Sequence, residues 1–142
     1  VDLLGLVITG QPLTAPELAP LRAATSDVFA VVVGGLFIVV TQPLAEELIF
    51  RGIAYPALRV SLGAWPGIIG SALTYGVFHL AAYSQGAPSS VETSLWYGLL
   101  GPALSGLVFT LNRSATGSTR AAIIAHTAFG LFALIKALTF AS

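Results

Sequence analysis

The polar residues of this chain that could carry out chemistry are few, and three of them lie close together. The chain has twelve charged residues among 142, six basic and six acidic. Glu46, Glu47 and Arg51 share one six-residue window between long apolar runs. An ionisable side chain at the centre of a membrane costs about 2.5–3.5 kcal/mol even on translocon-insertion scales. Function is a simple reason to retain three of them, although Glu47 and Arg51, four residues apart, could also form a purely structural ion pair.

The chain has two histidines, His79 and His126, and each lies within an apolar run. A single histidine in such a run can simply be hydrogen-bonded to a neighbouring helix. Tyr75, one helical turn before His79, is expected to pack or to form a hydrogen bond rather than to react. A carboxylate and two imidazoles that meet from separate helices would not be explained so easily. We therefore take Glu46, His79 and His126 as candidate catalytic residues.

Two kinds of chemistry suit these residue types. In the first, a buried Glu46 acts as a general base that activates a water molecule, and the histidines stabilise the oxyanion or protonate the leaving group. Glu46 and Glu47 would not both ionise easily in a low dielectric, and Arg51 would let the two carboxylates take different roles. In the second, Glu46, His79 and His126 are three ligands of a zinc ion, with water as the fourth ligand. Both end in the hydrolysis of a carbonyl compound.

The composition indicates a membrane protein. Hydrophobic residues make up 56% of the chain and charged residues 8%, and the mean hydropathy is +0.89. A soluble domain carries about 25% charged residues, so this chain cannot cover a water-facing surface with charge. The formal net charge is zero, which argues against a nucleic-acid partner. The chain has no cysteine, so neither a disulfide nor a thiolate metal site can form.

The apolar runs are long and do not alternate, which is typical of membrane helices and not of strands. Ser26 and Asp27 are both good N-cap candidates for the first helix. Pro43 is expected to break the pattern and start the second helix, and Pro102 is expected to kink the fourth. The sequence predicts an all-α polytopic transmembrane bundle of about five helices, at residues 28–40, 43–60, 65–83, 94–111 and 120–140. The expected connections are a tight turn at 61–63, a loop at 84–93 and a polar, turn-rich segment at 112–119.

The whole chain, residues 1–142, is expected to form one domain, with 1–22 as a connecting segment. The chain begins at Val1 and contains no methionine. We therefore expect it to be part of a longer protein whose upstream helices are missing.

The spacing of Glu46 and His79 predicts that they meet. They are 33 residues apart, and their midpoint, 62.5, falls inside the turn at 61–63. If two straight helices fold back at this turn, both side chains lie about 25 Å from it. Ser71, Tyr75 and His79 follow one another at four-residue intervals and form one polar line on the third helix. His126 lies about seven residues after the last connection, so it is expected at this depth only if its helix begins deeper in the membrane.

Three motifs of the chain resemble those of a known family. They are Glu-Glu-Leu-Ile-Phe-Arg-Gly at 46–52, Tyr-Gly-Val-Phe-His at 75–79 and His-Thr-Ala-Phe-Gly at 126–130. In this order, each in an apolar run, they resemble the signature of the CPBP family of intramembrane proteases, over about residues 28–140. That family includes the type II CAAX prenyl proteases, the bacteriocin-processing (Abi) proteins and the lysostaphin-resistance-A-like proteins.

The resemblance implies a role for each candidate residue. Glu46 would activate the water, and His79 and His126 would complete the catalytic site. Supporting roles would fall to Glu47, Arg51 and Tyr75. The metal requirement is ambiguous within the family, and we favour a metal-free glutamate mechanism over a zinc ion bound by Glu46, His79 and His126.

Gly130 departs from the family signature, in which an asparagine usually stands four residues after the second histidine. A glycine cannot donate a side-chain hydrogen bond to an oxyanion. The role of that asparagine is therefore vacant or filled by another group such as Thr127. This departure puts the rate of the reaction, and activity itself, in question.

Three functions are compatible with these observations. The first is an intramembrane endopeptidase of a bacterial cell membrane that acts on a peptide or membrane-protein substrate, as in the processing of secreted peptides or immunity to them. The second, which Gly130 favours, is a non-catalytic membrane scaffold or immunity protein. The third is a proton-coupled transporter that uses Glu46 and the histidines as a relay, for which a more clearly duplicated architecture would be expected. All three imply membrane lipid as the surroundings.

The sidedness of the chain rests on its basic residues. Lys136 is expected towards one side of the membrane. Four arginines are expected on the other side: Arg22, Arg59, Arg113 and Arg120. The positive-inside rule makes the arginine-rich side cytoplasmic, which places the candidate site nearer the outer face. The prenyl proteases of the resembling family act on cytoplasmic C-termini, so the sequence leaves the orientation open.

Overall fold

The structure, a computed structural model, describes residues 21, 23, 26–83 and 94–139. Within these ranges every regular element is helical and there is no strand. The loop expected at 84–93 and the connecting segment expected at 1–22, residue 21 excepted, lie outside the described residues. The assignment of residues 1–142 to one domain stays a prediction.

The first helix of the described chain is long and unbroken. Val28–Leu62 forms a single helical run of 35 residues. Its start agrees with the sequence, since the Asp27 carboxylate accepts a hydrogen bond from the Ala30 N–H at 3.1 Å and caps the helix. Its segments, in which η marks wider π-helical turns, are α3 (Val28–Leu36), η2 (Phe37–Thr41), α4 (Gln42–Glu47), η3 (Leu48–Ala54) and α5 (Tyr55–Leu62).

The break expected at Pro43 is wrong, because the two helices predicted on either side of it are continuous. Pro43, Pro56 and Pro102 are each the second residue after a π-helical stretch, namely η2, η3 and η4 (Ser94–Leu100). In an α-helix a proline ring clashes with the carbonyl four residues earlier. Here that carbonyl lies in a π turn, where the hydrogen bonds run from i to i+5. The wider turn therefore accommodates the ring, and the helix continues through the proline.

Two glycines make the turns between the other helices. Gly63, with a φ of 92°, lets α6 (Ala64–Tyr83) fold back on the first helix, which confirms the turn predicted at 61–63. Gly117, with a φ of 67°, caps α8 (Gly101–Thr116) in the left-handed conformation and precedes α9 (Thr119–Thr139). The connection expected at 112–119 is wrong over most of its length, because α8 continues until this glycine.

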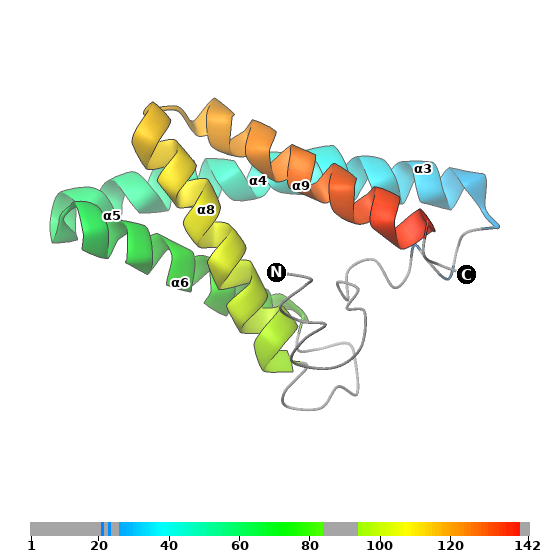
Figure 1. Cartoon of the computed structure of the whole chain (residues 1–142), viewed down its shortest axis with the longest axis horizontal. Coiled ribbons are helices and arrows are strands. Elements are labelled where there is room, and N and C mark those ends of the chain that lie inside the picture. Colours follow the sequence, from blue (N-terminus) through cyan, green and yellow to red (C-terminus); the bar gives the residue numbers. More distant parts are fainter. Residues whose placement is uncertain (1–20, 22, 24–25, 84–93, 140–142) are drawn as a thin grey trace.

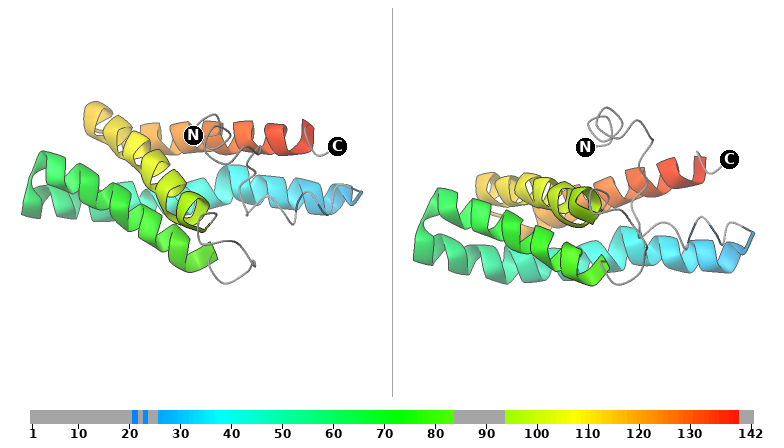
Figure 2. Two further views of the ribbon diagram at one scale, coloured as in Figure 1. Left: turned by 60° about the horizontal axis from the view of Figure 1, so that its bottom comes forward. Right: turned by 90° about the horizontal axis from the view of Figure 1, so that it is seen from below.

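The four helical runs pack so that the first one contacts helices on two sides. Figure 1 shows α6 beside α5, α8 crossing α6, and α9 running beside α3 and α4. The views in Figure 2 keep the same neighbours together. The middle of the first helix, around α4, therefore lies where α6, α8 and α9 can all approach it.

Burial in this bundle is reversed relative to a soluble protein. Large apolar side chains are exposed, with Val60 at 88%, Phe29 at 77% and Ile53 at 70% of their surface. The buried set contains an unusual number of polar residues: Glu46, Glu47, Arg51, Ser71, His79, Thr110 and His126. Three helices of the described chain are long and apolar enough to cross a membrane: Val28–Leu62, Leu95–Thr116 and Thr119–Thr139. The predicted all-α membrane bundle is thus confirmed.

Small residues set the distance between α5 and α6. A Cβ added at Gly67 would lie 2.8 Å from the backbone N and Cα of Arg59, so the two backbones touch here. A Cβ added at Gly70, one turn later, would lie 3.5 Å from a Leu58 side-chain carbon, which is an ordinary contact. Close backbone approach at small residues is typical of membrane helix packing.

We predict that Gly67→Ala lowers the free energy of unfolding by about 1–3 kcal/mol, the usual cost of overpacking. Gly70→Ala is the matched control on the same helix and should leave stability unchanged or slightly raised, because alanine favours helix. Thermal unfolding of the two variants in one detergent, followed by circular dichroism, compares them. Equal melting temperatures would show that α5 and α6 are not in contact at Gly67.

Candidate active site

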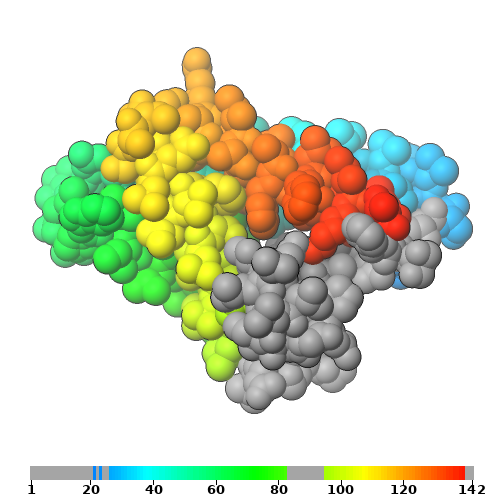
Figure 3. Space-filling model, in the orientation of Figure 1, coloured from blue at the N-terminus to red at the C-terminus, as the bar shows by residue number. Residues whose placement is uncertain are grey.

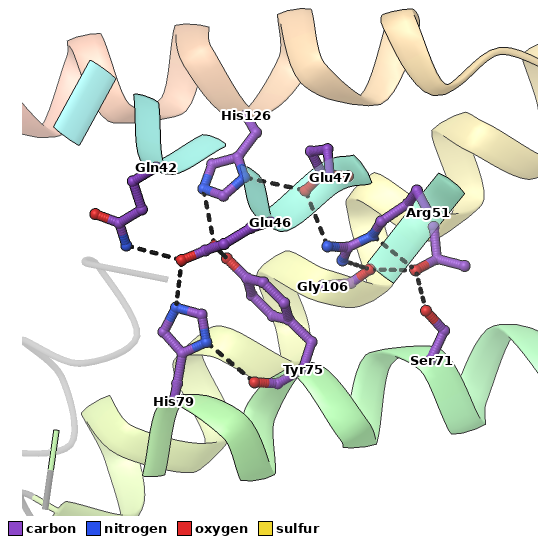
Figure 4. Close-up of polar contacts among 10 residues, drawn as sticks. Gln42, Glu46, Glu47, Arg51, Ser71, Tyr75, His79, Gly106 and His126 are labelled. Carbon is purple, nitrogen blue, oxygen red and sulfur yellow. Dashed lines mark hydrogen bonds and ion pairs between the residues drawn. The ribbon is translucent and has the colours of Figure 1, made fainter. Parts of the chain in front are cut away.

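Glu46 lies near the middle of the first helix, on α4, and its side chain is buried. The Tyr75 hydroxyl, from α6, donates a hydrogen bond to Oε2 at 2.6 Å. Gln42, one turn earlier on α4, donates from Nε2 to Oε1 at 2.9 Å. Figure 4 shows these two donors on either side of the carboxylate, so both of its oxygens are held in place.

Both predicted histidines face this carboxylate. His79 Nε2 lies 3.7 Å from Glu46 Oε1, and His126 Nε2 lies 3.9 Å from Glu46 Oε2. Each Nδ1 faces an acceptor on the other side of its ring, at 3.0 Å in both cases: the Tyr75 carbonyl for His79 and Glu47 Oε1 for His126. Because each Nδ1 donates its hydrogen to one of these acceptors, the Nε2 atom of each ring is the one that faces Glu46. The structure therefore brings together the acid and the two imidazoles that the sequence singled out.

The position of α9 explains how His126 reaches this depth. A Cβ added at Gly52 would lie 4.0 Å from Thr119 Cγ2, so α9 begins beside Gly52 rather than beside the α5–α6 turn. Gly52 is ten residues before the end of the first helix, which is about 15 Å. From this level Glu46 is six residues back along one helix and His126 seven residues along the other. The sequence placed His126 at the depth of Glu46 only if its helix began deeper than the α5–α6 turn, and α9 does begin deeper.

Glu47 and Arg51 form the predicted i,i+4 ion pair. Arg51 Nη1 lies 2.9 Å from Glu47 Oε1, and both side chains are fully buried. The guanidinium also reaches α8, where Nη2 donates to the Gly106 carbonyl at 2.7 Å and Nε to the Thr110 hydroxyl at 3.3 Å. Glu47 Oε1 in turn holds His126 on α9. The pair thus connects the first helix to two others.

The predicted polar line of α6 is buried inside the bundle. Ser71, Tyr75 and His79 are 0%, 2% and 4% exposed. The Tyr75 ring lies 4.5 Å below the Arg51 guanidinium carbon, which is a cation–π contact. Tyr75, for which a supporting role was predicted, therefore contacts both Glu46 and Arg51.

The sequence did not predict that four residues take part in this network: Gln42, Gly106, Phe109 and Thr110. Gln42 has a sequence signal, since it lies four residues before Glu46 on the same helix. Phe109 stacks on the His126 ring with centroids 4.5 Å apart and planes at 21°. Gly106 acts through its carbonyl, and a Cβ there would lie 2.9 Å from the Tyr75 ring. Nothing in the residue types of α8 marks these contacts, because they depend on how α8 crosses α6.

An open groove of about 340 Å³ lies beside Glu46. Apolar and aromatic side chains dominate its lining, and Glu46 and Gln42 are polar members of it. The lining residues are Phe37, Thr41, Gln42, Ala45, Glu46, Ile49, Phe50, Phe78 and Ala82. The carboxylate is therefore next to a space in which an apolar group can lie.

The predicted zinc alternative finds no ligand set here. Among the described residues no group of three or more His, Cys, Asp or Glu side chains is arranged to hold a metal ion. The Nδ1 contacts of the histidines are of the kind that orient metal ligands, but the three candidate side chains do not form such a group. We therefore derive no step through a metal ion.

Gly130 lies where α9 passes close to η2. A Cβ added there would lie 3.2 Å from the Ile38 carbonyl oxygen and 3.6 Å from Val39 Cα. The helices could accommodate a longer side chain only by moving apart. Thr127 is half-buried nearby on α9 and forms no hydrogen bond with the cluster in the described part of the chain.

The chain was compared with protein families, curated proteins and solved structures. No curated protein and no solved structure matches it. The model of one family, described as type II CAAX prenyl endopeptidase Rce1-like, matches residues 28–132. This range includes all three motifs and confirms the family resemblance inferred from them. The chain therefore belongs to the type II CAAX prenyl endopeptidase Rce1-like family.

Proposed function

We propose that this chain is an intramembrane endopeptidase that hydrolyses a peptide bond with a water molecule activated by Glu46. The observation that carries the proposal is the meeting of one buried carboxylate with the Nε2 atoms of His79 and His126, which come from two other helices. A base and two proton carriers around one pocket are the groups that amide hydrolysis uses. Family membership supports the same reaction class.

In this proposal Glu46 removes a proton from water as the water oxygen attacks the carbonyl carbon of the scissile bond. The carbonyl becomes a tetrahedral oxyanion, and a protonated His79 or His126 donates to it through the Nε2 hydrogen. The proton held by Glu46 then passes to the leaving amine as the C–N bond breaks. Tyr75 and Gln42 hold the carboxylate in place through a hydrogen bond to each of its oxygens.

Glu47 and Arg51 are positioning residues in this proposal. Glu47 is neutralised by Arg51 and holds the His126 ring through Nδ1. Glu46 receives hydrogen bonds from neutral donors, a phenol and an amide. The two adjacent acids therefore take separate roles.

We further propose that the substrate presents an apolar residue beside the scissile bond. The groove next to Glu46 is lined by Phe37, Ile49 and Phe78 among other apolar side chains. A peptide or a segment of a membrane protein within the bilayer fits this lining. A nucleic acid does not, because phosphates would have to enter an apolar groove beside a carboxylate.

A second candidate function, a non-catalytic membrane scaffold or immunity protein, is favoured by Gly130. Its backbone packs against the Ile38 carbonyl, so no side chain of residue 130 donates to an oxyanion. In this reading the polar cluster holds the fold together and partners bind elsewhere on the bundle.

Glu46→Gln tests the first candidate. We predict that it lowers the rate of cleavage of a fluorogenic peptide library by about 100-fold or more, the usual contribution of a general base. Asp27→Asn is the matched control, because it removes one carboxylate from the same helix and asparagine caps equally well. Cleavage is measured on purified protein in detergent, with circular dichroism as the check on folding.

Retained cleavage in a folded Glu46→Gln variant contradicts the proposal. If the parent protein itself cleaves no member of the library, and captures the same partners with and without the substitution, the scaffold function replaces it.

Arg51→Gln should destabilise the protein strongly. It leaves the buried Glu47 carboxylate without its cation, and loss of one member of a buried ion pair costs about 3–5 kcal/mol. Arg120→Gln, at an exposed position on α9, should change stability by no more than about 0.5 kcal/mol. Denaturant unfolding in a common detergent compares the two. Similar midpoints for both variants would mean that the Glu47–Arg51 pair is not buried.

Removal of metal ions should leave the reaction intact. Because no ligand group for a metal is arranged among the described residues, we predict that a chelator does not change the cleavage rate. Elemental analysis of the purified protein should find zinc well below one equivalent. Near-stoichiometric zinc whose removal abolishes turnover would restore the metal mechanism.

A further inference from the structure

Three arginines lie in the half of the bundle that contains the α5–α6 turn and the α8–α9 connection, the latter about 15 Å deeper along the first helix. Arg59 is in the last turn of α5, Arg113 is in the last turn of α8, and Arg120 is the second residue of α9. Lys136 lies in the last turn of α9, near its other end. Figure 3 shows the α8–α9 connection, yellow to orange, at the surface of this half of the bundle. Arg22, expected on the same side, lies outside the described residues.

Two of these arginines converge on one buried ring. The guanidinium carbons of Arg59 and Arg113 each lie 6.0 Å from the centroid of Tyr55, which is 1% exposed. Arg59 Nη1 donates to the Tyr55 hydroxyl at 2.9 Å, and Arg113 Nε donates to the Thr119 hydroxyl at 3.2 Å. These bonds hold both guanidiniums in place. A guanidinium has five N–H donors, so each of them keeps further donors for a ligand.

No carboxylate accompanies this pair within the described residues. The acidic residues described are Asp27, at the start of the first helix, and Glu46 and Glu47 inside it. All ion pairs found in those ranges involve the two glutamates with Arg51 or a histidine. Both guanidiniums are positively charged and contact the same ring, and no described carboxylate offsets their charge there. A basic residue in a last helical turn complements the helix dipole, but that effect does not require convergence on a shared ring.

The surroundings of the pair are those of a membrane surface. α6 begins directly against Arg59, since a Cβ at Gly67 would touch its backbone. Trp65, two residues before Gly67, is 68% exposed, and Val60, next to Arg59, is 88% exposed. Exposed tryptophan beside arginine is typical of the level at which lipid headgroups lie. Apolar side chains that acyl chains could contact, Val60 and Trp65, therefore lie next to guanidinium donors that a lipid headgroup could contact.

We propose that Arg59 and Arg113, on the support of Tyr55, bind the phosphate of an anionic phospholipid in this half of the bundle. Phosphate oxygens accept hydrogen bonds from guanidiniums in a forked geometry and carry the missing negative charge. The acyl chains of the lipid lie along the exposed apolar surface at Val60 and Trp65. This site is remote from Glu46 and does not depend on the proposed reaction.

Trp65 gives a local readout of this binding. In a Trp96→Phe background Trp65 is the remaining tryptophan, because the chain has two. The protein is reconstituted into phosphatidylcholine bilayers that contain increasing fractions of dibrominated phosphatidylglycerol, whose bromines quench tryptophan fluorescence. Dibrominated phosphatidylcholine serves as the neutral reference. We expect stronger quenching by the anionic lipid, and a loss of about fivefold in its relative affinity for each arginine replaced by glutamine.

Substitutions at the two arginines distinguish an effect of their charge on lipid binding from a loss of folding. Arg59→Gln with Arg113→Gln should remove the preference, Arg59→Lys with Arg113→Lys should retain most of it, and Lys136→Gln should leave it unchanged. Equal quenching by the two lipids in the parent overturns the proposal, as does a preference that survives both glutamine substitutions. If the parent shows no lipid preference but binds inorganic phosphate in detergent, free phosphate is the ligand and the lipid assignment is wrong.

Discussion

The buried ion pair between Glu47 and Arg51 is the interaction on which the rest of the site depends. Lipid tails are as apolar as leucine, so helices in a bilayer gain little from burying apolar surface against each other and rely on packing and polar contacts. Arg51 connects the first helix to α8 by hydrogen bonds to Gly106 and Thr110. Glu47 connects it to α9 by its contact with His126. Removing either charge leaves the other one buried without a partner, which is costly. The pair thus favours the one arrangement in which three helices meet.

The surroundings of Glu46 differ from those of Glu47, the residue beside it. Because Arg51 neutralises Glu47, the second carboxylate can remain in the same buried region without a like-charged neighbour. Its own donors are the Tyr75 hydroxyl and the Gln42 amide, which orient it without neutralising it. Two adjacent glutamates therefore form one structural site and one candidate catalytic site. Side chains on consecutive helix positions point about 100° apart, which is why each can serve a different set of partners.

The convergence of Glu46, His79 and His126 could be predicted because such residue types are rare in an apolar chain and the spacing of Glu46 and His79 fits a helical hairpin. The depth match between Glu46 and His79 needed only the rise per residue and the turn at Gly63. Prediction from the sequence failed at Pro43, since a proline in sequence does not reveal that a π turn before it will absorb the clash. It also missed Thr110 and Phe109, whose contacts follow from the crossing of α8 over α6. That crossing depends on close approaches at small residues such as Gly76 and Gly106, and the residue types alone do not give the angle at which two helices cross.

One carboxylate, Glu46, faces both imidazoles, and the small number of histidines in the chain makes this arrangement directly measurable. With two histidines in the chain, selective ¹⁵N labelling of histidine gives the ring signals of His79 and His126 alone. We expect Glu46→Gln to shift the Nε2 resonances of both rings and Asp27→Asn to shift neither. A spectrum in which only one ring responds, or neither, would contradict the convergence of the three helices on this acid.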